Sequence, residues 1–232
     1  MENNVLSVYD VVIDRNGKEE AEKAVDTKTM EAISRAISNV RKFHEEQLPK
    51  TWLTPRAYGS FLGQKMTPVD SVGIYVPGGK ASYPSTVLMT AVLANVAGVK
   101  ETIVVTPPQK TAINQATLAA CYICGVTHVY QVGGAQAVAA LAYGTETIPR
   151  VDKIVGPGNQ YVALAKKLVY GDVGIDSIAG PSEIVVVVDE TANNEWVAID
   201  LLAQAEHDEL ARTFLVCDNE EKLRSEERRV GK

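Results

Sequence analysis

The sequence contains few cysteines, few aromatic side chains and no long apolar run. Its 232 residues include three cysteines, an odd number that is too small for the framework of a disulfide-stapled secreted protein. Aromatic residues make up 6% of the chain. Nowhere do they alternate with a block of basic residues, a pattern that is typical of nucleic-acid-binding surfaces. No apolar stretch reaches the roughly 18 residues of a membrane span. We therefore expect neither a nucleic-acid partner nor a membrane anchor.

The net charge and the fraction of charged residues are both moderate. The net charge is −6 and charged residues make up 22%, while 46% of the chain is hydrophobic, which is ample material for a core. At the N-terminus there is no basic segment followed by an apolar one, so no signal peptide is expected. These features are typical of a mildly acidic enzyme, and we expect a cytoplasmic location.

Two of the cysteines, Cys121 and Cys124, form a C-x-x-C motif. This spacing occurs in redox and zinc sites, but here no second cysteine pair follows it. The motif also lies late in an apolar helical pattern. We therefore expect both thiols to be buried and chemically inert.

From Ser71 onward, short apolar segments alternate with helical patterns. Strands are expected at residues 72–76, 102–106, 128–132, 153–155, 184–188 and 213–217. Helices are expected at residues 85–96, 111–123, 135–143, 160–170 and 195–206. This order predicts an α/β fold with a Rossmann-like parallel sheet and helices on both faces, in one piece or split between two sub-domains. Because the strands are apolar throughout, and some helices nearly so, both should be buried.

An amphipathic helical pattern precedes this region. Its apolar positions lie three or four residues apart, at Met30, Ile33, Ile37 and Val40. Asp26 or Thr27 can cap the helix. We expect residues 1–55 to form an incomplete N-terminal helical segment and residues 56–223 to form the α/β region.

Glycine-rich turns separate many of the expected elements, at residues 77–80, 133–136, 156–159 and 180–183. In an open parallel sheet, ligands bind beyond the carboxyl ends of the strands, where we expect these turns to lie. Glycines let backbone N–H groups approach a ligand, and helix N-termini favour anions. None of the turns has the G-x-G-x-x-G or P-loop spacing, so nucleotide binding and plain turn chemistry both remain open.

Gln204 and His207 lie three residues apart on an expected helix and therefore share one face. An amide oxygen and an imidazole nitrogen so placed can reach one metal ion. A single histidine at a helix end is also a favourable partner for the helix dipole. The other two histidines, His44 and His128, are expected to have solvated or structural roles.

Five motifs, taken in order, resemble the signature series of the histidinol dehydrogenase family. They are YVPGGKASYPS at 75–85, VGGAQ at 132–136, KIVGPGN at 153–159, IAGPSE at 178–183 and QAEH at 204–207. The resemblance implies an enzyme that oxidises L-histidinol to L-histidine through an enzyme-held aldehyde, using two NAD⁺, in histidine biosynthesis. It also implies zinc as a second cofactor and a homodimer in the full-length protein.

The resemblance assigns roles to individual residues. NAD contacts are implied at Tyr75, Gln136 and Asn159. Contacts with L-histidinol are implied at Ser182, Gln204 and His207. Of these, Gln204 and His207 are also implied zinc ligands.

The family's catalytic Glu–His pair and its remaining zinc ligands are expected beyond Lys232, so no catalytic residue is assigned and this chain is expected to be an inactive fragment. The family also has additional N-terminal residues. Residues 224–232 resemble the translation of a sequencing adapter and are expected to be a non-native tail. The alternative is a nucleotide-binding α/β module without dehydrogenase chemistry, which would not need the Gln204–His207 pair.

Overall fold

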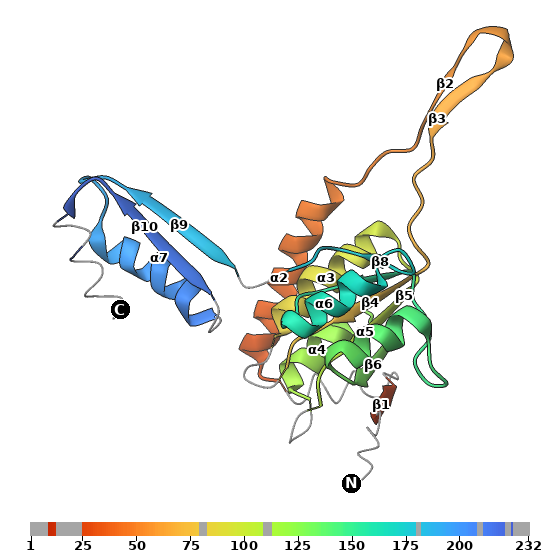
Figure 1. The fold of residues 1–232 in the computed structure, drawn as a ribbon. Helices are drawn as coiled ribbons and strands as arrows, with labels where there is room; N and C mark the ends of the chain where they lie inside the picture. The colour runs from red at the N-terminus through yellow and green to blue at the C-terminus, as the bar shows by residue number, and fades with distance from the viewer. Residues whose placement is uncertain are drawn as a thin grey trace. The chain divides into compact units, whose positions relative to one another are not determined.

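The computed structural model describes residues 9–12, 25–78, 83–108, 113–179, 182–207, 211–220 and 224. The chain divides into two compact units, Met1–Ala179 and Gly180–Lys232 (Figure 1). The division between the units therefore lies inside residues 56–223, which were expected to form the α/β region in one piece or split between two sub-domains. No helix among the described residues is both long and apolar enough to cross a membrane.

The first unit is built on a six-stranded sheet in the order β1-β6-β5-β4-β7-β8. The strands are β1 (Tyr9–Val12), β4 (Ser71–Tyr75), β5 (Glu101–Val105), β6 (His128–Gln131), β7 (Lys153–Val155) and β8 (Gly174–Ile175). Strand β1 pairs antiparallel with β6, and the other five strands are parallel. The predicted parallel sheet is confirmed, whereas the short strands β1 and β8 were not predicted.

Helices cover both faces of this sheet, as predicted. They are α2 (Thr27–Glu45), α3 (Pro84–Ala97), α4 (Gln115–Ile123), α5 (Gly134–Tyr143) and α6 (Gln160–Val169). Two separate clusters of buried apolar side chains form, one beneath α2, α3 and α4 and one beneath α5 and α6. Successive residues of β5 alternate between them: Ile103 and Val105 join one cluster and Val104 the other. A strand buried on both faces must be apolar throughout, which explains its pattern.

The helix ends follow from capping side chains. Asp26 caps α2, because its carboxylate accepts the N–H of Thr29 at 3.0 Å. Helix α4 begins later than the predicted residue 111, because Asn114 caps it by accepting the N–H of Ala116 at 2.9 Å. Residues 111 and 112 themselves lie outside the described part of the chain.

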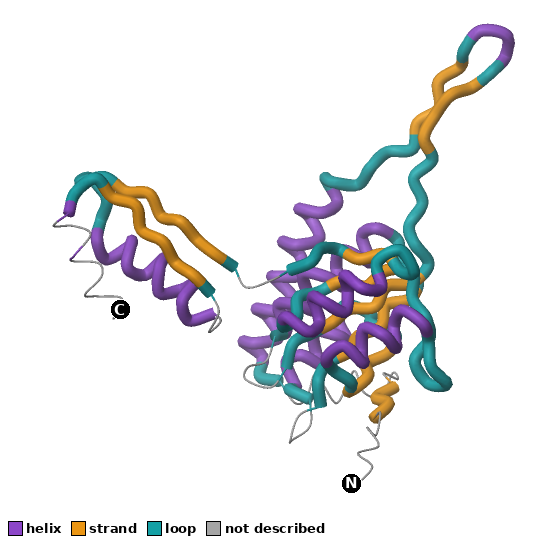
Figure 2. Tube along the Cα trace, viewed as in Figure 1, coloured by secondary structure: helices purple, strands orange, loops and turns teal. Residues whose placement is uncertain are grey.

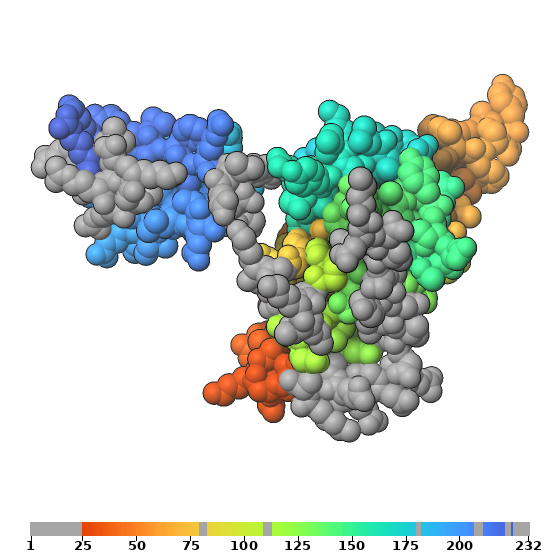
Figure 3. Space-filling view, turned by 60° about the horizontal axis from the view of Figure 1, so that its bottom comes forward, coloured from red at the N-terminus to blue at the C-terminus, as the bar shows by residue number. Residues whose placement is uncertain are grey.

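A hairpin of strands β2 (Trp52–Pro55) and β3 (Phe61–Gln64) was not predicted. Its tip is a short 3₁₀ turn, η1 (Ala57–Gly59), which Figure 2 shows between the two strands. All eight strand residues are exposed, and the hairpin projects from the packed body of the first unit in Figures 1 and 3. Proline and glycine within the strands hid them from the sequence pattern.

The second unit is a β-α-β element made of β9 (Glu183–Val188), α7 (Asn194–His207) and the parallel strand β10 (Arg212–Cys217). The prediction that its strands are buried on both faces is wrong for the described residues, since Val185 is 60% and Val187 73% exposed. The physical reason is that α7 covers one face of the two-stranded sheet.

Candidate functional site

The strand order of the first unit reverses between β4 and β7. From β4 the chain passes through β5 to β6, then returns to the other side of β4 to form β7. In such sheets the crevice for a ligand lies at the carboxyl ends of the two strands that flank the reversal. Tyr75 is the last residue of β4, and Gly156 directly follows β7. The turn with Gly133 follows β6 at the same edge.

The three residues expected to contact NAD come together at this edge. Tyr75, Gln136 and Asn159 line one cavity of about 360 Å³. The rest of its lining consists of turn and strand-end residues: Gly78, Pro107, Pro108, Gln131, Val132, Gly133 and Gly134. Residues far apart in the sequence thus converge, as a dinucleotide site requires. That NAD is the ligand stays a prediction.

Tyr75 links the turns around the cavity. Its side chain is buried, and its hydroxyl oxygen accepts the N–H of Gly134 at 3.0 Å. Burial raises the pKa of the Tyr75 hydroxyl, and the Gly134 N–H partly opposes this change. The hydroxyl therefore keeps its proton at neutral pH and can donate it to an oxygen atom of a ligand.

Two helix N-termini open at the cavity. Asn159 caps α6, because its side-chain oxygen accepts the N–H groups of Tyr161 and Val162, each at 3.1 Å. The Nδ2 group of Asn159 carries the protons that this side chain can donate to a ligand. Gln136 is exposed in the first turn of α5. The dipoles of both helices favour a phosphate at this edge.

Gly156 allows the turn at residues 156–159 to pack closely against the end of β4 at Tyr75. Its φ of +104° is one that residues with a side chain rarely adopt. A Cβ at this position would also collide with the backbone carbonyl of Tyr75. Both observations require a glycine at position 156, directly after β7 and beside the end of β4.

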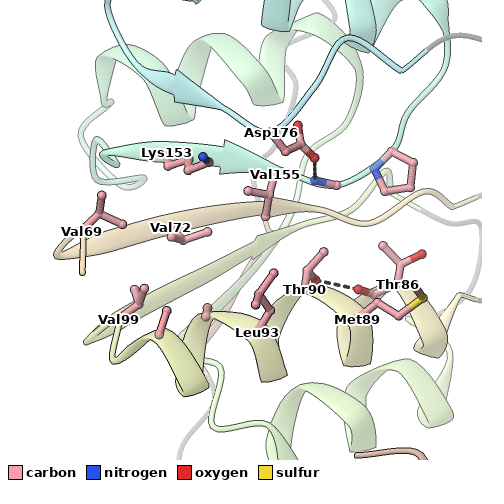
Figure 4. A pocket seen from close by; sticks show the side chains of 14 residues that line it. Val69, Val72, Thr86, Met89, Thr90, Leu93, Val99, Lys153, Val155 and Asp176 are labelled. Carbon is pink, nitrogen blue, oxygen red and sulfur yellow. Dashed lines mark hydrogen bonds between the residues drawn. The ribbon is translucent and has the colours of Figure 1, made fainter. Parts of the chain in front are cut away.

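A second cavity of about 550 Å³ lies between α3 and β7, where most of the lining is apolar (Figure 4). Met89 and Leu93 reach into it from α3, opposite Val72 and Val155. The expectation that α3 is buried all round is wrong here, since Met89 is 64% exposed. The reason is that α3 packs on the sheet through its other face. A cavity with few donors suits apolar groups and not the phosphates of a nucleotide.

The C-x-x-C motif is not a reactive site. Cys121 and Cys124 are free thiols buried in the core beneath α4. Burial raises the pKa of Cys124 to about 11 and also raises the pKa of Cys121. Both thiols therefore stay protonated at neutral pH, which confirms the prediction that they are inert.

The residues expected to bind substrate and metal lie in the second unit. Ser182 is exposed directly before β9, and its backbone carbonyl accepts the N–H of Arg212 at 3.4 Å. Ser182 lies at the amino end of β9, and the first two residues of its turn lie outside the described residues, so the expected position of the turn at a carboxyl strand end stays a prediction. Since β9 and β10 are parallel, α7 must return the chain to the edge where both strands begin. The last turn of α7, with Gln204 and His207, therefore ends at the edge of Ser182.

The described residues do not make up a complete metal site. Gln204 is partly exposed near the end of α7, while the side chain of His207 lies outside the described part of the structure. Across the described residues there is no group of three His, Cys, Asp or Glu side chains that could hold a metal ion. Two ligands are fewer than the three that zinc sites in proteins use. Any zinc site involving Gln204 and His207 therefore needs ligands from elsewhere.

Comparison with known proteins identifies the family. The sequence profile of histidinol dehydrogenase matches residues 3–232, and so extends through the segment expected to be a non-native tail, whose origin stays a prediction. The histidinol dehydrogenase of Wolinella succinogenes is 52% identical over 92% of this chain and 49% of its own length. That of Pseudomonas putida is 55% identical over 90% of this chain and 48% of its own length.

A solved structure agrees with the sequence matches. The crystal structure of histidinol dehydrogenase from Elizabethkingia anophelis has a TM-score of 0.86 at 39% identity, covering 95% of this chain and 52% of its own chain. The present chain thus spans about half the length of the curated relatives it matches. With its sheet, its glycine turns and its sequence all in agreement, the chain belongs to the histidinol dehydrogenase family.

Proposed function

We propose that this chain carries the NAD-binding part of an enzyme that oxidises L-histidinol to L-histidine in histidine biosynthesis. The observation that carries the proposal is the convergence of Tyr75, Gln136 and Asn159 on one cavity at the carboxyl edge of the parallel sheet. Membership of the family supports the reaction, and the glycine turns at two helix N-termini suit a dinucleotide.

Each residue has a role that its surroundings support. Bound NAD supplies the hydride acceptor. The positive ends of the α5 and α6 helix dipoles attract the pyrophosphate, as helix N-termini attract anions elsewhere. The hydroxyl of Tyr75 and the amides of Gln136 and Asn159 bind the ribose and nicotinamide portions and fix their orientation.

The substrate and zinc site is the second part of the proposal. Ser182, Gln204 and His207 contact L-histidinol, and Gln204 and His207 supply two of the zinc ligands. Zinc, when bound, polarises and orients the substrate's nitrogen-bearing end. The other ligands and the Glu–His acid–base pair come from the part of the protein outside this chain. We further propose that the full-length enzyme is a cytoplasmic homodimer.

The cofactor role is tested by titrating the purified chain with NAD⁺ and measuring the heat of binding. Gln136→Ala should weaken NAD⁺ binding about three- to tenfold, as expected for loss of one hydrogen bond. The matched control is Gln115→Ala, which removes an exposed glutamine from the first turn of α4, outside the cavity lining. Equal NAD⁺ affinities of the two variants would remove Gln136 from the site.

A further inference from the structure

A buried cation lies on α6, the helix that Asn159 of the proposed cofactor cavity caps. Lys166 is on α6, and its side chain is 2% exposed, among the largest fully buried side chains in the described core. Its ammonium group donates to the backbone carbonyl of Gly156 at 3.0 Å and to the carboxylate of Asp176. Burying a lysine is unfavourable unless its charge is paired and hydrogen-bonded, so these two contacts account for its position.

Asp176 binds the backbone N–H of Gly156, whereas Lys166 binds its carbonyl. Asp176 follows β8 and lies beside the end of β7, where its own N–H donates to Ile154 at 3.2 Å. One carboxylate oxygen accepts the N–H of Gly156 at 2.8 Å, the bond drawn beside Asp176 in Figure 4. The other oxygen accepts from Lys166 and from the N–H of Ser177. Both polar backbone groups of Gly156 are therefore held by one ion pair.

Gly156 directly follows β7 and lies beside the end of β4. It packs on the backbone of Tyr75 with a φ of +104°, and the turn that it begins ends at Asn159, the cap of α6. Lys166 lies on that same helix. The ion pair thus fixes the turn with Asn159 relative to the strand with Tyr75, although neither charged group lines the cavity with those two residues.

We propose that Lys166 and Asp176 are positioning residues of the cofactor site, which clamp Gly156 so that Tyr75 and Asn159 face one dinucleotide. This inference rests on the proposed function. An apolar pair of similar volume would fill the same space without the cost of burying charge, so packing alone does not require an ion pair. What the charges add is a fixed orientation of the Gly156 peptide groups.

The test compares NAD⁺ affinities of the purified chain and of four variants by calorimetry, with the melting temperature of each. Asp176→Asn weakens the ion pair and should lower NAD⁺ affinity about tenfold or more, as loss of a charged hydrogen bond does. Lys166→Met should have the same effect, whereas Lys166→Arg, which keeps the charge, should restore part of the affinity. The matched control is Lys167→Met, which removes the exposed neighbouring lysine and should change nothing.

A double-mutant cycle separates positioning from plain stabilisation. Asn159→Ser keeps a capping side chain on α6 but removes the amide. If the clamp acts partly by positioning Asn159, adding Asp176→Asn to Asn159→Ser should cost less affinity than adding it to the parent chain. Losses that multiply instead, or an Asp176→Asn chain that binds NAD⁺ like the parent, would overturn the positioning role.

The remaining outcomes are also decisive. A parent chain that folds but does not bind NAD⁺ refutes the proposed function, and the inference with it. A parent chain that binds, alongside variants that bind equally well, refutes the inference alone. If Asp176→Asn and Lys166→Arg both fail to fold, the pair is a requirement for folding and the positioning role is wrong.

Discussion

At the scale of single residues, Tyr75 contacts both of the glycine turns that carry the other two proposed cofactor residues, Gln136 and Asn159. The hydroxyl of Tyr75 meets the first residue of α5, and its backbone meets Gly156. Gln136 and Asn159 follow within a few residues of these two contacts. A short strand end thus sets the relative positions of turns that are remote in sequence.

A carboxylate at the opposite end of the same two strands contributes to stability. One oxygen of Asp152 accepts the N–H groups of Asp70 and Ser71 and the Ser71 hydroxyl, at 3.0, 2.9 and 3.1 Å. Hydrogen bonds from Ser71 are the main reason why the pKa of Asp152 is lowered. A lowered carboxyl pKa means that the contribution is present above the ordinary value and is lost as the pH falls through the folded-state value.

Asp152→Ala should therefore lower the melting temperature at neutral pH, and this difference should shrink in acid. The gap between parent and variant should close below the ordinary carboxyl pKa of 3.8, towards the lowered value. Melting curves followed by circular dichroism across this pH range give the result. A gap that stays constant down to the acid limit would show that the charge of Asp152 is not what stabilises the fold.

At the scale of the elements, the sequence predicted the bounds of those strands that are marked by a continuous run of buried apolar residues. Strand β7 was predicted at its observed bounds and the ends of β4 and β5 to within one residue, because both of their faces are buried and leave a continuous apolar run. The start of α4 was missed because the capping side chain of Asn114 decides it. The exposed hairpin β2–β3 was missed because no burial pattern marks it.

The end of α3 illustrates a boundary that local chemistry determines. Gly98 ends the helix with a φ of +87°, in the left-handed region. Gly98→Ala should destabilise the first unit by about 1 kcal/mol, because the added Cβ is strained there. Space is not the cause, since the nearest atom to that Cβ would be 3.6 Å away, on Pro68.

Urea denaturation of the parent, Gly98→Ala and Gly98→Asn measures this effect. Asparagine tolerates the left-handed region better than alanine, so its loss of stability should be the smaller of the two. Equal stability of the parent and Gly98→Ala would mean that the helix end rearranges without cost.

At the scale of the whole molecule, the candidate cofactor residues lie in the first unit, and the candidate substrate and metal residues lie in the second. The glycine turns and the family resemblance predicted the residues of the cofactor cavity, and the structure brings these together. Ser182 lies at the amino end of β9, whereas the turns that line the cofactor cavity follow the carboxyl ends of strands. The metal site could not be completed from a chain that spans about half the length of its relatives.

This division predicts that the chain alone does not oxidise L-histidinol. The proposed acid–base pair lies outside it, and a positioned base contributes typically 10²–10⁴-fold to such a reaction. The proposed zinc site also has only two ligands assigned within this chain, Gln204 and His207. Residues 1–223, purified and supplied with L-histidinol, NAD⁺ and zinc, should form no measurable NADH. Turnover near that of a full-length relative would place the base within this chain.

The central claim is that the carboxyl edge of the first sheet binds NAD⁺, and nuclear magnetic resonance of the ¹⁵N-labelled chain tests it most directly. On titration with NAD⁺, the amide signals of Gly134, Gln136 and Asn159 should shift together and saturate at one concentration. The amides of Leu93 and Val99, which line the apolar cavity, should stay in place. Shifts confined to the apolar cavity, or no shifts in a folded chain at millimolar NAD⁺, would contradict the account.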